Sequence, residues 1–248
     1  MWVFAGGMFR SGSTLQFQLA SALVERAGVG RRHEWVPPED FADIAPRLDD
    51  DPQLIVFKTH VCKHPMRERL RDGRAIALST HRDLRDVAVS AARKAGVEPT
   101  PEYCRELMEG CIACARGWEG SPGILEQAYT HLTTNTAQAC LEIAAHLGVD
   151  CSPAQASALA DEFSVTSQRD RIEQAVREGR MVKPTPNAVM VHMEREYLHP
   201  NHIDDAAVGK WRRALCPEAV AVIERIAGDW LAQHGYPLTA VARAGADG

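Results

Sequence analysis

The sequence predicts an α/β protein in three layers, with a central, mainly parallel sheet flanked by helices and a helical C-terminal half. Two short apolar runs, residues 54–57 and 75–78, have the length and composition of strands that are buried on both faces. The stretch from Val3 to Leu15 gives a third observation, because it has the pattern of a strand, a glycine-bounded loop and a helix. Strands that alternate with helices in this way build parallel sheets.

Length and composition indicate an ordinary globular protein. A chain of 248 residues can bury one substantial core, so we expect a single domain over residues 1–240 and a flexible tail over 241–248. Hydrophobic residues make up 45% and charged residues 25% of the chain, as in typical globular domains. The net charge of -5 argues against a protein that binds nucleic acid through its overall charge.

Cysteine usage and the first residues predict a cytoplasmic protein. An odd number of cysteines, seven, does not suggest a disulfide framework. Residues 1–5 have no basic leader and only a short apolar run, and no later stretch reaches the length of a membrane span. We therefore expect no signal peptide and no stable membrane insertion.

Cys111 and Cys114 form a single C-x-x-C pair. Such a pair can bind zinc or carry redox chemistry, but no second pair accompanies it. The neighbouring apolar residues, Met108, Ile112 and Trp118, favour a helix that buries two small side chains. A structural role is the preferred interpretation.

The glycine-bounded loop predicts an anion site. Gly7 and Gly12 are spaced as in the phosphate-binding G-x-x-x-x-G-K-[ST] loop, but Ser13 replaces the lysine, Thr14 keeps the hydroxyl, and the cation of the loop is Arg10. Glycines let backbone N–H groups converge on an anion, and the start of a helix adds its positive dipole end. The alternative is an ordinary tight turn with a helix-capping serine.

The next elements follow from the spacing of apolar residues. The first helix is predicted to continue to Gly28, because leucine or alanine recurs at positions 15, 19, 23 and 27. A short strand is expected over 31–36, and Pro37 and Pro38 open a further helix. The mixed charges of 67–72 predict a short, exposed helix.

Polar residues follow both buried strands. Lys58, Thr59 and His60 come directly after the run 54–57, at the sheet edge where ligands of α/β proteins bind. The run 75–78 leads to Arg82, a helix that begins near Asp83, and Ser90 on that helix, which together form a second potential anion grip. The competing interpretations are a structural histidine and an ion pair of Arg82 with Asp86.

The rest of the chain is predicted to be mostly helical. Helices are predicted at 101–118, at 136–147, where Gly148 closes the helix, and at 154–163 and 170–177, with a strand at 124–129. Residues 179–202 are predicted to form an irregular binding loop or lid. A last helix stops at Gly235 and carries the core-facing residues Val220, Ile223, Ala227, Trp230 and Leu231.

Taken together, the segments at the strand ends resemble the PAPS-dependent sulfotransferases, which use 3′-phosphoadenosine-5′-phosphosulfate (PAPS) as donor. Residues 9–14 resemble the 5′-phosphosulfate loop of that family, residues 58–60 its catalytic segment, and residues 82–90 its 3′-phosphate motif. Phe9 and Leu84 stand where the family often has proline, and Arg10 stands where many members have lysine. The fold expected from this resemblance is P-loop-like.

The resemblance implies transfer of a sulfuryl group from PAPS to a hydroxyl or amine of a small-molecule acceptor, with PAP (adenosine 3′,5′-bisphosphate) as product and no metal. His60 would be the general base, since an unperturbed histidine pKa is about 6.5. Lys58 and Arg10 would stabilise the transferring group and the leaving phosphate. The residues that would hold the donor are Arg10, Ser11, Gly12, Ser13, Thr14, Arg82, Ser90, Tyr129 near the adenine, and Gly209 and Lys210 near the 3′-phosphate.

Two other functions stay open at this level. One is a P-loop nucleotide-dependent kinase, although the loop lacks its lysine. The other is a non-catalytic nucleotide-binding protein. The acceptor itself cannot be assigned from a fold, and we expect its pocket to use residues 96–118 and 183–202. A homodimer is a possible assembly.

Overall fold

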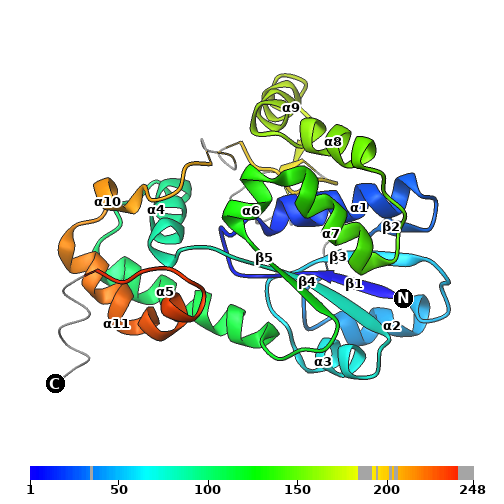
Figure 1. The fold of residues 1–248 in the computed structure, drawn as a ribbon, viewed down its shortest axis with the longest axis horizontal. Coiled ribbons are helices and arrows are strands. Elements are labelled where there is room, and N and C mark those ends of the chain that lie inside the picture. Colours follow the sequence, from blue (N-terminus) through cyan, green and yellow to red (C-terminus); the bar gives the residue numbers. More distant parts are fainter. Residues whose placement is uncertain (34–35, 184–191, 194, 201–202, 204–205, 240–248) are drawn as a thin grey trace.

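The structure is a computed structural model that describes residues 1–33, 36–183, 192–193, 195–200, 203 and 206–239. Its centre is a five-stranded sheet in the order β2-β3-β1-β4-β5, in which every neighbouring pair is parallel. Helices cover both faces of the sheet (Figure 1), so the predicted α/β class is confirmed. The strands of the sheet are β1 (Trp2–Ala5), β2 (Gly30–Arg32), β3 (Leu54–Lys58), β4 (Ala75–His81) and β5 (Ile124–Ala128).

One face of the sheet packs against helices that include the one following the glycine loop. Residues alternate along β1, because side chains of a strand point to opposite faces. Val3 and Ala5 therefore join the cluster on this face, with Phe17 among its members. The helices on this side are α1 (Ser13–Arg26), α6 (Tyr129–Thr134), α7 (Thr136–Leu147) and α8 (Pro153–Glu162).

The opposite face buries an aromatic cluster under α2 (Phe41–Leu48) and α3 (His64–Arg71). Trp2 and Phe57 lie with ring centroids 4.9 Å apart, near the distance at which aromatic pairs interact favourably. Residues 67–71 are helical, as predicted, but the prediction that this helix is exposed is wrong. The helix begins earlier, at His64, and Met66 and Leu70, one turn apart, are buried against the sheet despite their charged neighbours.

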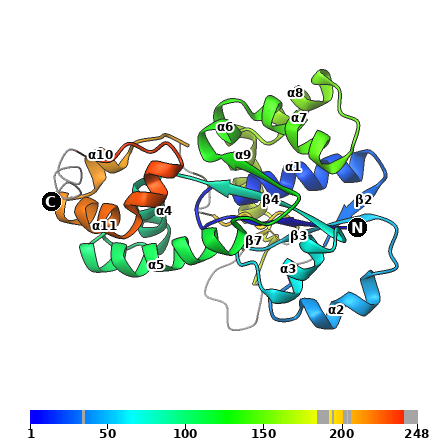
Figure 2. The ribbon, with the colours of Figure 1, turned by 60° about the horizontal axis from the view of Figure 1, so that its bottom comes forward.

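A second group of helices lies beyond the carboxyl ends of the strands (Figure 1). Its helices are α4 (Leu84–Ala95), α5 (Pro101–Trp118), α10 (Trp211–Ala214) and α11 (Pro217–Gln233). Figure 2 shows α5 extending from this group toward the sheet. Cys111 and Cys114 are buried on α5, and burial raises the pKa of the Cys111 thiol to about 12. The predicted helix that buries these two small side chains is therefore confirmed.

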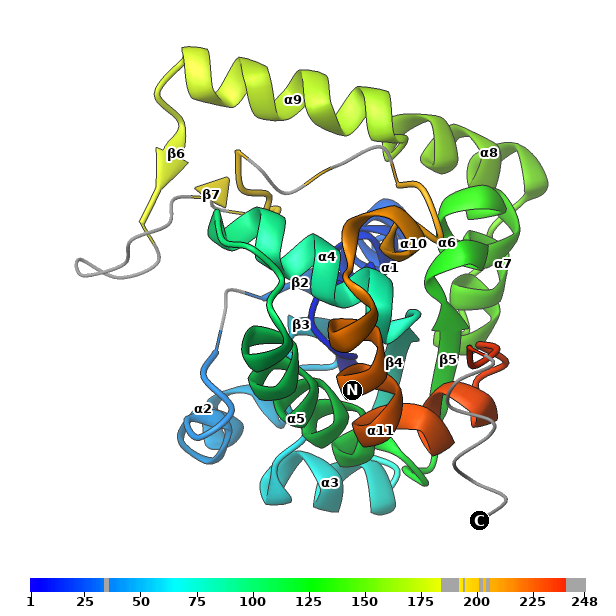
Figure 3. The ribbon, with the colours of Figure 1, turned by 90° about the vertical axis from the view of Figure 1, so that its left-hand side faces the viewer.

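The segment after α8 crosses one side of the molecule (Figure 3). Helix α9 is longer than predicted, Val165–Arg177, because the Ser164 side chain caps it by accepting the N–H of Ser167. The predicted irregular region of 179–202 contains a short antiparallel pair, β6 (Met181–Val182) and β7 (His192–Met193). Residues 184–191, 194 and 201–202 of that region, and the predicted tail, lie outside the described residues.

Most predicted elements agree with the structure within a few residues. The α5 and α7 bounds match the predicted ranges, and α4 begins one residue after its cap, Asp83. The structure places β2 at Gly30–Arg32, which overlaps only the first two residues of the strand predicted at 31–36. Among the helices that the structure describes, none has the length and the apolar character needed to span a bilayer.

Candidate active site

The loop between β1 and α1 is held against β4. Gly7 has a φ of 96°, and a Cβ at this position would lie 2.6 Å from the backbone nitrogen of Thr80, so only glycine fits. The Ser11 hydroxyl donates to the carbonyl oxygen of Met8 at 2.6 Å and lies 2.6 Å from Oγ1 of Thr80. These contacts fix the path of the loop and bury Ser11 completely.

Helix α1 starts at the end of this loop without a side-chain cap. Its N-cap residue is Gly12, with a φ of 92°, and no side chain accepts a hydrogen bond from the first turn. The N–H groups of that turn, which begins at Ser13 and Thr14, and the positive end of the helix dipole are therefore available to an anion. The local geometry supports the anion site that the spacing of the glycines predicts.

The lysine absent from the loop is replaced in space by Lys58, which ends the neighbouring strand β3. Its Nζ donates to Oγ of Ser13 at 2.9 Å, and Ser13 occupies the lysine position of the phosphate-binding motif. Lys58 is only 3% exposed, and burial lowers its pKa from 10.5 to about 7. An anion in the loop would favour the charged form of this side chain and raise that pKa again.

His60 lies two residues further along the same chain segment and faces the cavity. Its Nδ1 is 3.0 Å from the carbonyl oxygen of Gly7, and the indole N–H of Trp118 donates to its backbone oxygen at 3.0 Å. Burial, followed by the charge of Lys58, lowers the pKa of His60 from 6.5 to about 3. The ring is therefore neutral at pH 7, as expected, but its pKa is far from the ordinary value used in the prediction.

Arg82 reaches the loop from the end of β4. Its guanidinium lies 3.9 Å over the ring of Tyr129 and donates to the carbonyl oxygens of Arg10 at 3.3 Å and Ala207 at 3.4 Å. The Nε atom is buried and has no hydrogen-bond partner among the described residues. A buried donor without a partner is costly in a native protein, which favours a ligand at this position.

The alternative pairing of Arg82 with Asp86 is not formed. The carboxylate of Asp86 instead accepts the backbone N–H of Gly209 at 2.6 Å and that of Trp211 at 3.1 Å. Ser90, one turn further along α4, accepts a hydrogen bond from Nε of Arg10 at 3.0 Å. The two predicted anion grips are therefore joined directly by side chains.

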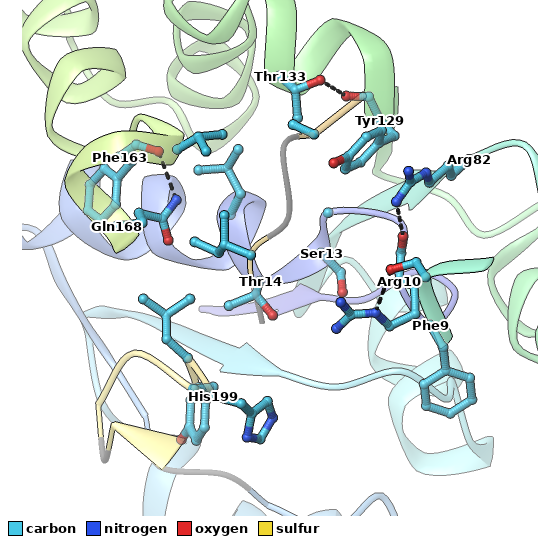
Figure 4. Close-up of a pocket in the computed structure, with 18 of the residues that line it drawn as sticks. Phe9, Arg10, Ser13, Thr14, Arg82, Tyr129, Thr133, Phe163, Gln168 and His199 are labelled. Atoms are coloured by element: carbon cyan, nitrogen blue, oxygen red, sulfur yellow. Dashed lines mark hydrogen bonds between the residues drawn. The ribbon is translucent and has the colours of Figure 1, made fainter. Parts of the chain in front are cut away.

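One cavity of about 480 Å³ contains most of the predicted site (Figure 4). Although the chain is acidic overall, Asp86 is the one acidic residue among the described residues that line this cavity. A cavity with this charge focuses a positive potential on an anionic ligand. The predicted site residues in its wall are Arg10, Gly12, Ser13, Thr14, Lys58, His60, Arg82, Ser90, Tyr129 and Lys210.

Two predicted donor-binding residues do not line the cavity. Ser11 uses its hydroxyl to hold the loop, and Gly209 donates its N–H to Asp86. Of the two segments predicted to form the acceptor pocket, only one lines the cavity. His192, Tyr197, Leu198 and His199 of the segment 183–202 line the cavity, whereas no residue of 96–118 does. Helix α5 instead supports the site from behind, through the contact of Trp118 with the His60 backbone.

Sequence reasoning missed an apolar part of the cavity and one cation. Phe163 and Gln168 come from the α8–α9 junction, where Nε2 of Gln168 donates to the Phe163 carbonyl oxygen at 2.7 Å (Figure 4). Lys94 comes from the last turn of α4. The i, i+4 spacing of Ser90 and Lys94 on one helix could have indicated Lys94, whereas no local signal in the sequence indicates Phe163.

Comparison with known proteins gives matches at the level of structure. No protein-family model and no curated protein matches the sequence. Retinol dehydratase in complex with androsterone and the inactive cofactor PAP is similar, with a TM-score of 0.62, 18% identity, and coverage of 93% of this chain and 80% of that chain. Retinol dehydratase in a complex with retinol and PAP gives a TM-score of 0.61, 17% identity and coverage of 93% and 81%.

The third solved structure is mouse sulfotransferase SULT7A1 complexed with PAP. The similarity has a TM-score of 0.65 and 15% identity, and it covers 98% of this chain and 87% of that chain. A likeness over so much of both chains, at such low identity, establishes the architecture. The chain therefore has the fold of the PAPS-dependent sulfotransferases.

Proposed function

We propose that this protein transfers a sulfuryl group from PAPS to a hydroxyl or amine of a small-molecule acceptor. The observation that carries this proposal is the hydrogen bond of Lys58 to Ser13, because it brings a cation into the uncapped loop. The same chain segment then brings His60 to the cavity that also contains Arg82 and Ser90. The side chains proposed as the base, as the phosphosulfate site and as the 3′-phosphate site thus line one cavity, which supports the proposal.

The proposed donor fits the charges of the cavity. The first-turn N–H groups of α1, Arg10 and Lys58 would hold the phosphosulfate group. Arg82, Ser90 and Lys210 would hold the 3′-phosphate, and the unpartnered Nε of Arg82 supports this assignment. The fit of PAPS is also supported by the structures that contain PAP and share this fold.

The cavity has an apolar part that would hold the adenine ring of the nucleotide. Tyr129 lies beside the loop, since a Cβ on Gly12 would be 3.1 Å from its ring. Leu15 and Phe163 line the same cavity from α1 and the end of α8. Flat apolar surfaces of this kind suit an adenine ring, and stacking of a nucleobase on an aromatic side chain contributes about 1–3 kcal/mol.

His60 is the residue proposed to take the acceptor proton. Its Nδ1 faces a carbonyl oxygen, so Nε2 is the nitrogen left to accept a proton. As the acceptor oxygen bonds to sulfur and the bond from sulfur to the phosphate oxygen breaks, the acceptor proton passes to Nε2. Lys58 and Arg10 would compensate the charge that develops on the leaving phosphate. The anionic donor would raise the pKa of His60 from about 3 and make it a better base.

A ligand comparison by thermal shift tests the proposed donor. At equal concentrations, PAP is expected to raise Tm far more than ATP with magnesium does, because only PAP presents a 3′-phosphate to Arg82 and Ser90. Equal stabilisation by the two ligands, or greater stabilisation by ATP with magnesium, would contradict the proposal and favour a kinase.

A further inference from the structure

Asp86 is the one acidic residue among the described residues that line the cavity. It is 1% exposed, and along the chain it stands midway between Arg82 and Ser90, which are proposed to hold the 3′-phosphate. A carboxylate at such a position repels the phosphate that the site is proposed to bind. A second role that outweighs this repulsion would explain why the cavity contains an acid.

Both carboxylate oxygens of Asp86 accept hydrogen bonds from the backbone of a distant segment. Oδ2 accepts the N–H of Gly209 at 2.6 Å, and Oδ1 accepts the N–H of Trp211 at 3.1 Å. Gly209 has a left-handed φ of 77°, and Lys210 is right-handed, with a φ of -58° and a ψ of -29°. Such a turn lets nearby N–H groups converge on one anionic group. Asp86 thus fixes the backbone on both sides of Lys210.

Residues 206–211, the 206–211 segment, have further contacts with the region around α4. Nη2 of Arg82 donates to the carbonyl oxygen of Ala207 at 3.4 Å, and the guanidinium of Arg85 lies 4.1 Å over the ring of Trp211. Ala206 has a φ of 56°, a strained conformation that an alanine keeps only where its surroundings impose it. Helix α10, which begins at Trp211, lies beside α4 (Figure 1). The segment is therefore docked on α4 at several points.

We propose that Asp86 is a positioning residue for the 3′-phosphate site, and that it holds the 206–211 segment so that Lys210 reaches the same phosphate as Arg82 and Ser90. This inference rests on the proposed function, which puts the 3′-phosphate at these residues, and adds the residue that assembles their site. Ser90 and Lys210 both line the cavity but come from α4 and from the 206–211 segment. The two hydrogen bonds of Asp86 set the distance between these two parts.

Two simpler roles for Asp86 predict different outcomes. If Asp86 only caps the first turn of α10, its loss lowers the stability of the fold and leaves the recognition of the 3′-phosphate unchanged. If Asp86 acts only through its charge, its neutralisation removes a repulsion and strengthens the binding of PAP. A positioning role predicts the opposite sign, because the position of Lys210 is lost together with the repulsion.

The experiment measures the affinities of PAP and of adenosine 5′-monophosphate by calorimetry, at pH 7 and constant ionic strength. The ratio of these affinities reports recognition of the 3′-phosphate. The proteins are wild type, Asp86→Asn, Lys210→Met, and the double variant. Asparagine keeps the size of the side chain but places an NH₂ group, which cannot accept a hydrogen bond, against one of the two backbone N–H groups.

Glu224→Gln is the control for a general weakening of α4. Glu224 accepts a hydrogen bond from Arg85 of α4 and does not line the cavity. It is buried, as Asp86 is, so its substitution also removes a buried carboxylate contact of the same helix. This variant should lose stability and keep the wild-type ratio of PAP to adenosine 5′-monophosphate affinity.

The expected result is that the affinity ratio falls at least about tenfold in Asp86→Asn and in Lys210→Met, because each loses one charge-assisted contact with the 3′-phosphate. The double variant should lose no more than the weaker of the two single variants, since both side chains act through that contact. The affinity for adenosine 5′-monophosphate should change little in all proteins.

Gly209→Ala tests the same turn without changing any charge, and it also serves if Asp86→Asn does not fold. An L-residue disfavours the left-handed φ that aims both N–H groups at Asp86, so the affinity ratio should fall. Gly28→Ala has a similar backbone cost, at a φ of 68° and away from the cavity, and should keep the wild-type ratio.

Three results would overturn the inference. The first is that Asp86→Asn binds PAP more tightly than wild type does or keeps the wild-type ratio. The second is that the losses of Asp86→Asn and Lys210→Met add up in the double variant. The third is that Gly209→Ala lowers the ratio no more than Gly28→Ala does. Failure of the proposed function is distinguishable, because wild type itself would then show no binding of PAP, before any variant is compared.

Discussion

Nδ1 of His60 lies 3.0 Å from the carbonyl oxygen of Gly7. A carbonyl oxygen only accepts hydrogen bonds, so Nδ1 carries the proton of the neutral ring and Nε2 keeps its lone pair. Gly7 belongs to the loop proposed to hold the donor, and that loop is fixed against Thr80. The base and the donor loop are therefore positioned by the same backbone.

Gly7→Ala should destabilise the protein because both the backbone and the space require glycine. The φ of 96° is unfavourable for an L-residue, and the added Cβ would lie 2.6–2.7 Å from three atoms of Thr80. Backbone strain and overpacking together predict a loss of about 3–4 kcal/mol in the free energy of unfolding. Urea denaturation measures this loss.

Gly28→Ala is the matched control for that substitution. Gly28 also has a left-handed φ, 68°, but nothing lies within 4 Å of an added Cβ. Its cost should be limited to backbone strain of about 1–2 kcal/mol. If Gly7→Ala costs no more than Gly28→Ala, the loop is not held against β4 as described.

PAP affinity should fall as the pH rises above 7. Lys58 has a pKa of about 7 in the unliganded protein, so it loses its charge above this pH, and the protein must then take up a proton to bind the anion. The 3′-phosphate, with a second pKa of about 6, is already ionised and does not contribute to the trend. Calorimetric titrations between pH 7 and 9 should show affinity falling by up to about tenfold per pH unit.

Lys58→Met tests whether Lys58, rather than another group in the cavity, causes this dependence of PAP affinity on pH. The variant should bind PAP more weakly than wild type at pH 7, with a flatter dependence on pH, because the group that titrates is gone. A wild-type affinity that stays constant from pH 7 to 9, or an unchanged slope in Lys58→Met, would show that Lys58 does not contact the phosphosulfate end.

Arg82→Ala should weaken the binding of nucleotides that carry a 3′-phosphate more than the binding of nucleotides that lack it. The affinity ratio of PAP to adenosine 5′-monophosphate should fall about 10- to 100-fold, because one charge-assisted contact is lost with only one of these ligands. Binding assays with both ligands measure the ratio in wild type and variant. If both affinities fall by the same factor, the role assigned to Arg82 is wrong.

Glu224→Gln should weaken the attachment of α4 to α11. The carboxylate of Glu224 accepts from Nη1 of Arg85 at 2.7 Å, and both side chains are 1% exposed. Loss of this buried charged hydrogen bond predicts a decrease of about 1.5–3 kcal/mol in the free energy of unfolding. Glu218→Gln, on the exposed face of the same helix, should change it by less than about 0.5 kcal/mol. Equal effects of the two substitutions would contradict a structural role for the pair.

The sequence predicted the elements whose signals are local. The helix from Pro101 to Trp118 begins with a threonine cap and a proline, and the α7 helix ends at Gly148 in a left-handed conformation. The buried run before Lys58 also predicted β3 and the sheet edge at which the site forms. These features depend on neighbouring residues, which is why spacing alone found them.

The parts of the site that depend on distant contacts could not be predicted. The approach of Lys58 to Ser13 joins residues 45 positions apart, and it depends on the order of strands in the sheet. The low pKa of His60 results from burial, which no motif reports. Phe163 enters the cavity only because of the way α8 and α9 meet.

Formation of PAP from PAPS by wild type and by His60→Ala tests the central claim most directly. With an acceptor panel present, wild type should convert PAPS to PAP and labelled product. The variant should bind PAP as tightly but react at least about 100-fold more slowly, because it has lost its general base. If wild type binds PAPS and leaves it intact with every acceptor, or if His60→Ala reacts at the wild-type rate, the account of this site as a sulfotransferase centred on His60 is contradicted.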